Sequence, residues 1–267
     1  MLRPRIIPCL LVQNGGLVKT VKFGEPKYVG DPINAVKIFN EKEADELVVL
    51  DIDATAQNRE PNYRLISQFA AECRMPLCYG GGVKTVEQAA RIIGLGVEKV
   101  AVSAAALEQP ALVGAMAEAV GGQSVVVVLD VRAAKTPDGY EVWTHNGTRN
   151  TGKSPWPIMA DAEARGAGEI VVNMIDRDGV MGGYDLELAK RARQTVSLPL
   201  TFLGGAGSLA GIRDLITTCG VVGAAAGSLF VFKGPYRAVL INYPSELQKA
   251  DIVKSAARDG AVPATHE

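Results

Sequence analysis

Glycine-rich loops at two places in the chain could bind phosphate groups. Gly80-Gly81-Gly82 and Gly204-Gly205-Ala206-Gly207 each follow an apolar run and precede a helix-like segment. Glycine lets backbone N–H groups approach an anion at the start of a helix. Ser103-Ala104 and Ala226-Gly227-Ser228 follow two further apolar runs. These sites predict a ligand with a phosphate at each end, unless the glycines only make tight strand-to-helix turns. The second-half loops are favoured, because the first half offers fewer hydroxyls.

Side chains suited to proton transfer or metal binding are few. Asp130 ends an apolar run, and its carboxylate either moves a proton or caps nearby backbone N–H groups. His145 and His266 are the only histidines, which disfavours histidine-based metal or triad chemistry. The four cysteines show no CxxC spacing and are interpreted as free thiols. We therefore expect no metal and no cofactor.

The chain repeats its own pattern. ELVVLDID begins at Glu46 and EIVVNMID at Glu169, while PLCYGGG begins at Pro76 and PLTFLGG at Pro199. Both pairs lie 123 positions apart. Two blocks at one offset predict two similar halves with the same order of strands and helices.

Short apolar runs alternate with helix-like segments. The predicted strands are Ile6–Val12, Glu46–Asp51, Leu77–Tyr79, Val100–Val102, Val125–Asp130, Ile170–Asn173, Leu200–Leu203 and Gly223–Ala225. Continuous apolar runs are typical of parallel strands buried on both faces. We predict an α/β fold, a (β/α)8 TIM barrel of two half-barrels over residues 1–244, followed by a polar, frayed or loosely packed tail over 245–267. A doubly wound open sheet is the alternative, although no GxGxxG follows the first strand.

The long connections and the overall charge narrow the function further. Residues 13–30 and 132–155 come after the first and fifth strands, where barrel loops form the active-site face. The net charge of −1 argues against binding to nucleic acid or to a membrane surface. No segment approaches the roughly 20 apolar residues that span a bilayer. With no signal-peptide pattern at the start, we expect a cytoplasmic protein.

Motifs along the chain together resemble a known family. They read RIIPCL, LVVLDI, YGGGVKTVE, VVLDV, GAGEI, DRDG, GYDLEL and LGGAGS, between Met1 and about Phe232. In this order and spacing the chain resembles the cyclase (synthase) subunit of imidazole glycerol phosphate synthase. The resemblance implies a barrel of two half-barrels that partners a glutaminase at its N-terminal face. Such a subunit uses the ammonia to cyclise a bis-phosphorylated ribulosyl substrate.

One catalytic position departs from that family. The resemblance implies two acid–base aspartates, at the ends of the first and fifth strands. Asp130 fits the fifth strand, but Leu11 stands on the first, and the internal repeat also aligns PCLLV with VVLDV. Loss of one member of such a pair costs roughly 100- to 10,000-fold in rate. Either this barrel no longer performs the cyclase reaction, or another group has replaced the missing acid.

Other family positions are kept in part. Ala104, Leu203 and Val180 stand where the family has polar groups, so we expect a different substrate. Lys19 fits the family's phosphate-contacting lysine of the loop after strand one, and we group it with Asp130 as catalytic. Asp51 also matches. The candidate ligand-binding set is Gly81, Gly82, Ser103, Asp178, Gly179, Gly204, Gly205, Gly227 and Ser228.

Four charged residues match the ring that gates ammonia entry at the bottom of the family's barrel. They are Arg5, Glu46, Lys99 and Glu169. Two cations and two carboxylates can balance one another, whereas an unpaired buried charge is costly. The alternative is a structural ring of salt bridges that plugs the barrel, and both roles can hold together.

Two segments resemble a divergent branch of the family, associated with sugar amidation for bacterial surface polysaccharides. They are Lys233–Pro244 and Asn14–Phe23. In that branch the barrel works with a glutaminase and a separate amidotransferase, which convert an acetamido group of a nucleotide-linked sugar to acetamidino. We therefore expect an ammonia-channelling subunit for lipopolysaccharide O-antigen biosynthesis. A working cyclase of histidine biosynthesis is one alternative. A non-catalytic barrel that binds a phosphorylated ligand and activates the glutaminase is another.

Overall fold

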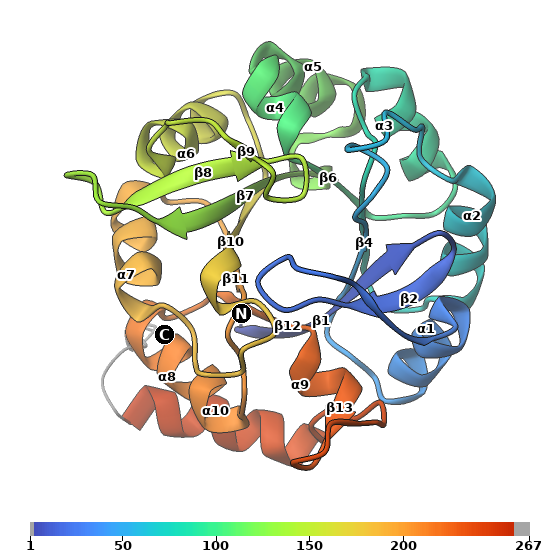
Figure 1. Cartoon of the computed structure of the whole chain (residues 1–267), viewed down its shortest axis with the longest axis vertical. Coiled ribbons are helices and arrows are strands. Elements are labelled where there is room, and N and C mark those ends of the chain that lie inside the picture. Colours follow the sequence, from blue (N-terminus) through green and yellow to red (C-terminus); the bar gives the residue numbers. More distant parts are fainter. Residues whose placement is uncertain (1–2, 259–267) are drawn as a thin grey trace, which may run out of the picture.

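The computed structural model describes residues 3–258, which form a closed barrel of parallel strands surrounded by helices (Figure 1). In order around the barrel, the strands are β1 (Arg5–Gln13), β4 (Leu47–Asp51), β5 (Leu77–Gly80), β6 (Lys99–Val102), β7 (Val125–Ala133), β10 (Glu169–Met174), β11 (Leu200–Leu203) and β12 (Gly223–Ala226). β12 pairs with β1 and so closes the ring. The predicted (β/α)8 barrel is confirmed, and the open-sheet alternative is wrong.

The outer helices follow the strands in sequence. They are α1 (Pro32–Glu41), α2 (Tyr63–Glu72), α3 (Val86–Gly94), α5 (Ala111–Val120), α6 (Pro155–Ala164), α7 (Leu186–Thr195), α8 (Leu209–Cys219) and α10 (Glu246–Arg258). The short helices α4 (Ala104–Glu108) and α9 (Ser228–Val231) precede α5 and α10. Side chains cap several N-termini; Asp31, for example, accepts a hydrogen bond from the Asn34 amide and is followed by Pro32. The sequence therefore fixes these starting points locally.

The strands are buried on both faces because two separate cores contact them. The larger core lies between strands and helices and contains Phe39, Phe69 and Phe230. The smaller core fills the barrel interior with Ile7, Cys9, Val48, Cys78, Ala101, Val126, Val128, Val171, Leu203 and Ala225. This double burial explains the continuous apolar runs in the sequence.

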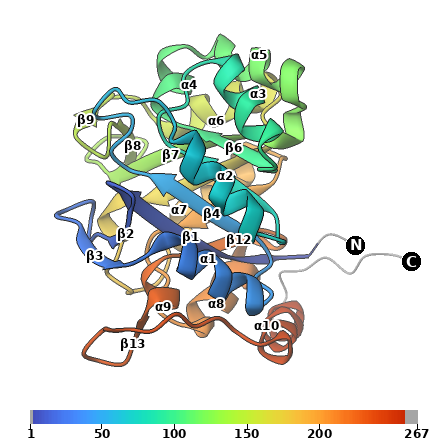
Figure 2. The ribbon, with the colours of Figure 1, turned by 90° about the vertical axis from the view of Figure 1, so that its right-hand side faces the viewer.

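The two long connections form hairpins at one end of the barrel, as Figure 2 shows. β2 (Gly16–Lys19) and β3 (Lys27–Gly30) follow β1, whereas β8 (Tyr140–Thr144) and β9 (Arg149–Asn150) follow β7. The tips of the two connections touch, since a Cβ atom on Gly147 would lie 2.9 Å from Phe23 Cδ2. Both long loops therefore flank the carboxyl ends of the strands.

The C-terminal segment corrects an expectation from the sequence. Residues 246–258 are not a frayed tail but the eighth outer helix, α10, which contacts α8. Ile252 and Ala256 lie one helical turn apart and are buried, and Lys249 pairs with Asp45 at 2.9 Å. The barrel thus continues past residue 244, and the rest of the predicted tail lies outside the described residues. Within residues 3–258, no helix combines the length and hydropathy needed to cross a membrane.

Candidate functional site

A cavity of about 460 Å³ opens at the carboxyl ends of the barrel strands. The candidate residues that line it are Lys19, Asp51, Gly81, Gly82, Ser103, Asp130, Asp178, Gly227 and Ser228. Gly179, Gly204 and Gly205 are not among the lining residues. The structure thus brings most of the predicted set together. Of the favoured second-half loops, only Gly227 and Ser228 lie in the wall, and the first-half glycine loop lies there as well.

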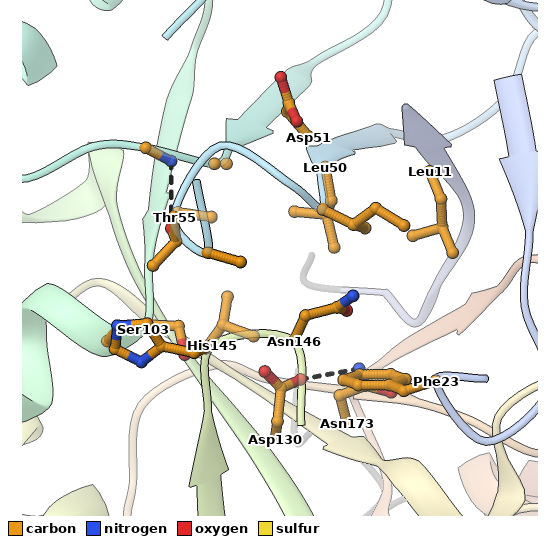
Figure 3. Close-up of a pocket in the computed structure, with 18 of the residues that line it drawn as sticks. Leu11, Phe23, Leu50, Asp51, Thr55, Ser103, Asp130, His145, Asn146 and Asn173 are labelled. Atoms are coloured by element: carbon orange, nitrogen blue, oxygen red, sulfur yellow. Dashed lines mark hydrogen bonds between the residues drawn. The ribbon is translucent and has the colours of Figure 1, made fainter. Parts of the chain in front are cut away.

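Asp130 lies at the end of β7 and faces this cavity (Figure 3). Its Oδ1 accepts a hydrogen bond of 2.9 Å from Asn173 Nδ2, and β10 places Asn173 beside Asp130 in strand register. Burial raises the pKa of Asp130 to about 7, and the neighbouring Asp178 adds to this effect, while the Asn173 hydrogen bond opposes it. The carboxyl group can therefore take up or release a proton near neutral pH.

The corresponding position in the first half-barrel is apolar. Leu11 on β1 pairs in register with Leu50 on β4, as Asp130 pairs with Asn173. Leu50 and Asn173 are 123 positions apart, the offset of the sequence repeat. Figure 3 shows both leucines on the side of the cavity away from Asp130. Only the second half-barrel therefore presents polar groups at this level.

Lys19 extends from β2 into the barrel. Its Nζ donates a hydrogen bond of 2.6 Å to the Cys9 carbonyl, and the side chain is buried. Burial lowers the pKa of Lys19, although the nearby Asp178 opposes this change. A Cβ atom on Gly227 would lie 2.4 Å from Lys19 Nζ, so glycine leaves space for the amine.

Asp178 and Gly179 hold the connection after β1 in place. Thr20 Oγ1 donates a hydrogen bond of 2.7 Å to Asp178 Oδ2, and the Lys22 amide donates one of 2.9 Å to the Asp178 carbonyl. Gly179 has a φ of +67°, and a Cβ atom there would lie 2.3 Å from the Thr20 carbonyl. The DRDG motif thus has a clear structural role beneath this loop.

Two glycines of the predicted phosphate loops make equivalent close contacts with backbone. A Cβ atom on Gly81 would lie 2.4 Å from the Asp51 carbonyl oxygen, and one on Gly204 would lie 2.5 Å from that of Met174. Their φ angles are +120° and +92°, values that favour glycine. Tight turns explain both glycines, so neither residue requires a bound phosphate.

The predicted charged ring closes across the opposite end of the barrel. Lys99 Nζ lies 2.9 Å from Glu46 Oε1 and 2.9 Å from Glu169 Oε2. Arg5 Nη2 lies 2.7 Å from Glu169 Oε1, and Arg5 also pairs with Glu46. Burial and the adjacent Glu169 raise the pKa of Glu46. Burial acts on Glu169 too, but hydrogen bonds from Arg5 hold its pKa below the ordinary value.

Asn173 and Leu50 are among the cavity residues that sequence reasoning missed. The repeat carried the signal, because LVVLDID and IVVNMID align Leu50 with Asn173. His145 lines the cavity, and its Nδ1 lies 3.1 Å from Thr144 Oγ1. Within residues 3–258, no cluster of three or more metal-ligating side chains could hold a metal ion.

Known proteins resemble this chain over nearly its whole length. The family model described as "Histidine biosynthesis protein" matches residues 5–236. A Leptospira interrogans protein named "Putative imidazole glycerol phosphate synthase subunit HisF" is 57% identical over 249 residues, 93% of this chain and 98% of that protein. The Pseudomonas aeruginosa "Putative imidazole glycerol phosphate synthase subunit hisF2" is 53% identical over 252 residues, 94% of this chain and 100% of that protein. A Hyphomonas neptunium "Imidazole glycerol phosphate synthase subunit HisF" is 40% identical over 232 residues, 87% and 91% of the two chains. The chain therefore belongs to the histidine biosynthesis protein family, among the cyclase-like subunits of imidazole glycerol phosphate synthase.

Proposed function

We propose that this chain is a barrel subunit that receives ammonia from a glutaminase and conducts it through the barrel without cyclising a substrate. The observation that carries the proposal is the contrast between the two ends of the barrel. The complete ring of Arg5, Glu46, Lys99 and Glu169 stands at one end. At the other end Leu11 and Leu50 stand at the paired positions of the first half-barrel, where the family resemblance implies a second acid–base aspartate.

The interior between these ends suits a small neutral molecule. Ile7, Val48, Val126 and Val171 belong to a buried apolar cluster within the barrel. Ammonia crosses apolar surroundings more easily than ammonium, because burying an unpaired charge is costly. The glutaminase would therefore dock at the N-terminal face, next to the charged ring.

The acceptor that we propose is the acetamido group of a nucleotide-linked sugar for lipopolysaccharide O-antigen biosynthesis. A separate sugar amidotransferase would add ammonia to the acetamido carbon and release its oxygen, activated by a nucleoside triphosphate, to give the acetamidino group. The support is the resemblance of Asn14–Phe23 and Lys233–Pro244 to the sugar-amidating branch. These two segments lie on either side of the DRDG loop. The Lys22 amide bonds the Asp178 carbonyl, and Arg237 Nη2 donates a hydrogen bond of 2.7 Å to the Gly179 carbonyl.

A phosphorylated small molecule is a second proposed ligand, and it would occupy the cavity. Lys19, Lys84 and Arg149 line the wall and can attract an anion. Binding of such a ligand would support the alternative in which the barrel activates the glutaminase without reacting.

The test compares two nitrogen sources. The chain, the glutaminase and the amidotransferase are combined, and the acetamidino sugar is measured with glutamine or with ammonium chloride. We expect Lys99→Met and Arg5→Met to lower glutamine-dependent product at least tenfold and to preserve ammonium-dependent product. Lys190→Met, an exposed change on α7, is the control. Unchanged glutamine-dependent product in both gate variants would contradict the conduit.

The cyclase alternative has its own assay. The purified chain is supplied with the ribulosyl substrate and excess ammonium salt, and imidazole product is measured. Turnover close to that of an authentic cyclase would overturn the proposed function.

A further inference from the structure

We propose that Asp130 and Asn173 form a binding site for one ammonium ion at the end of the barrel's apolar interior. The inference rests on the proposed function, because it names the place where nitrogen pauses before it leaves the barrel. The two residues lie on adjacent strands, β7 and β10, at paired positions (Figure 3).

Two oxygen acceptors at this site have unused hydrogen-bonding capacity. Asn173 Nδ2 donates to Asp130 Oδ1, which fixes the orientation of the Asn173 amide. Asn173 Oδ1 is buried and has no hydrogen-bond partner among the described residues. Buried polar oxygens are normally paired, so this atom calls for a donor that the folded chain does not supply. The second Asp130 oxygen likewise receives no hydrogen bond from residues 3–258.

Apolar side chains lie beside these acceptors on the neighbouring strands. Leu203 on β11 pairs in register with Asn173, and Val128 lies on β7 just below Asp130. Leu11 and Leu50 form the apolar pair at the corresponding place in the other half-barrel. A hydroxyl-rich substrate would leave its polar groups unpaired against this surface. A small ion that carries only N–H donors requires no more than the two oxygens.

The charge that acts on the Asp130 carboxyl group is that of a second carboxylate, which favours a cation at this group. Asp178 is the nearby carboxylate that raises the pKa of Asp130, and the nearby cation Lys19 donates to the Cys9 carbonyl instead. None of the described residues forms an ion pair with Asp130. The other charged or titratable groups that face the cavity or share the strand are Cys9, Asp51, Lys84, Glu108, Arg132, His145 and Arg149.

The site can also change the charge of the bound nitrogen. Ammonium transfers one proton to the Asp130 carboxylate, which yields neutral ammonia and a carboxylic acid; no other bond forms or breaks. The pKa of Asp130, raised to about 7 by burial, makes the carboxylate a proton acceptor near neutral pH. The proton then returns to water at the cavity mouth. Asp130 and Asn173 would in this way release nitrogen in its nucleophilic form.

The first test uses the purified chain alone at pH 8. Ammonium chloride is titrated while NMR follows the Asn173 side-chain amide, with sodium chloride at equal ionic strength as the reference. We expect a saturable shift with ammonium only. Asp130→Asn should weaken it at least tenfold, whereas Asn34→Leu on the exposed face of α1 should not. Circular dichroism checks that each variant is folded.

A second measurement locates the ion directly. Crystals are soaked in rubidium chloride, whose cation is close in size to ammonium, and anomalous scattering is measured. We expect a peak in contact with both Asp130 and Asn173 Oδ1. A linear shift in the titration, or an equal shift in Asp130→Asn, would overturn the site. The proposed function would survive that result if the gate variants still block glutamine-dependent transfer. Saturable ammonium binding together with unchanged glutamine-dependent product in the gate variants would contradict the proposed conduit but not the ammonium site.

Discussion

Asn173 on β10 donates a hydrogen bond of 2.9 Å to Asp130 on β7. In the first half-barrel the same paired positions hold Leu50 and Leu11. The polar pair and the apolar pair therefore occupy equivalent places in a fold that repeats itself. At these paired positions only the second half-barrel carries a group that can exchange a proton.

Asp130→Asn should change how the stability of the protein depends on pH. Burial raises the pKa of Asp130 from its ordinary 3.8 to about 7 in the folded state. The folded chain therefore binds this proton more tightly than the unfolded chain, and the resulting stabilisation is lost as the pH rises to about 7. Between pH 5 and pH 8 we expect the variant to gain about 2–3 kcal/mol relative to the unmodified chain.

Urea unfolding at pH 5, 6, 7 and 8 measures this gain. Asn keeps the acceptor for Asn173 Nδ2, so the comparison isolates the charge. Asp214→Asn, on the exposed side of α8, is the matched control and should show no such trend. A free-energy difference between Asp130→Asn and the unmodified chain that stays constant over this range would contradict a raised pKa.

Removal of one charge from the charged ring should lower the free energy of unfolding more than removal of two opposite charges. Lys99 lies 2.9 Å from both Glu46 Oε1 and Glu169 Oε2, and all three side chains are largely buried. Lys99→Met leaves two carboxylates with Arg5 alone, and we expect a loss of about 3–5 kcal/mol in unfolding free energy. Adding Glu46→Gln should recover part of that loss, which a double-mutant cycle measures. Strictly additive losses would show that Lys99 and Glu46 do not interact.

The strands and the half-barrel repeat could be predicted because they depend on local pattern. Buried parallel strands require continuous apolar runs, and each of the eight predicted runs is a barrel strand in the structure. The comparison of Leu11 with Asp130 followed from the equivalent places of the first and fifth strands in the two halves, since these residues lie 119 positions apart, four fewer than the repeat offset. The repeat paired Leu50 with Asn173, but an asparagine within a strand gives no sign of its partner until the register is known.

Gly204→Ala should destabilise the chain by more than the loss of glycine's backbone freedom alone would. Gly204 has a φ of +92°, and a Cβ atom would lie 2.5 Å from the Met174 carbonyl oxygen. Gly139 is a matched control, because its φ is +75° and an added Cβ atom would meet nothing within 4 Å. We expect a loss of about 1 kcal/mol for Gly139→Ala and at least about 3 kcal/mol for Gly204→Ala. Equal midpoints in chemical denaturation would contradict the close approach to β10.

Helix α10 was missed because its burial depends on tertiary contacts. The segment is polar, and only Ile252 and Ala256 mark a buried face. Lys249 reads as a solvated charge in the sequence, yet it is buried against Asp45 and donates to the Glu43 carbonyl. The exclusion of Gly204 from the cavity wall also depends on contacts between segments distant in sequence. Periodicity cannot reveal such pairings.

Lys249→Met should show how much the contact between α10 and Asp45 contributes to stability. Lys249 Nζ lies 2.9 Å from Asp45 Oδ1, and Asp45 Oδ2 accepts a hydrogen bond of 2.9 Å from the Ile6 amide on β1. Loss of the cation leaves the buried carboxylate with only the exposed Arg3, 3.6 Å away, as a charged partner, so we expect a loss of about 3 kcal/mol. Lys254→Met on the exposed face of α10 should cost less than about 0.5 kcal/mol. Similar losses in both variants would show that the Asp45 contact contributes nothing specific.

Leu11→Asp should restore a carboxylate without restoring cyclisation. The new side chain would face Leu50 rather than a hydrogen-bond donor, since the register pairs these two positions. Ala104 and Leu203 would still present apolar surface to the cavity. We expect a loss of about 2–4 kcal/mol at pH 8 and a smaller one at pH 5, because burial favours the protonated acid. Leu11→Asn separates the effect of polarity from that of charge. The imidazole assay with excess ammonium should show no turnover above that of the unmodified chain. Turnover within tenfold of an authentic cyclase would mean that Leu11 alone separates this barrel from a working cyclase.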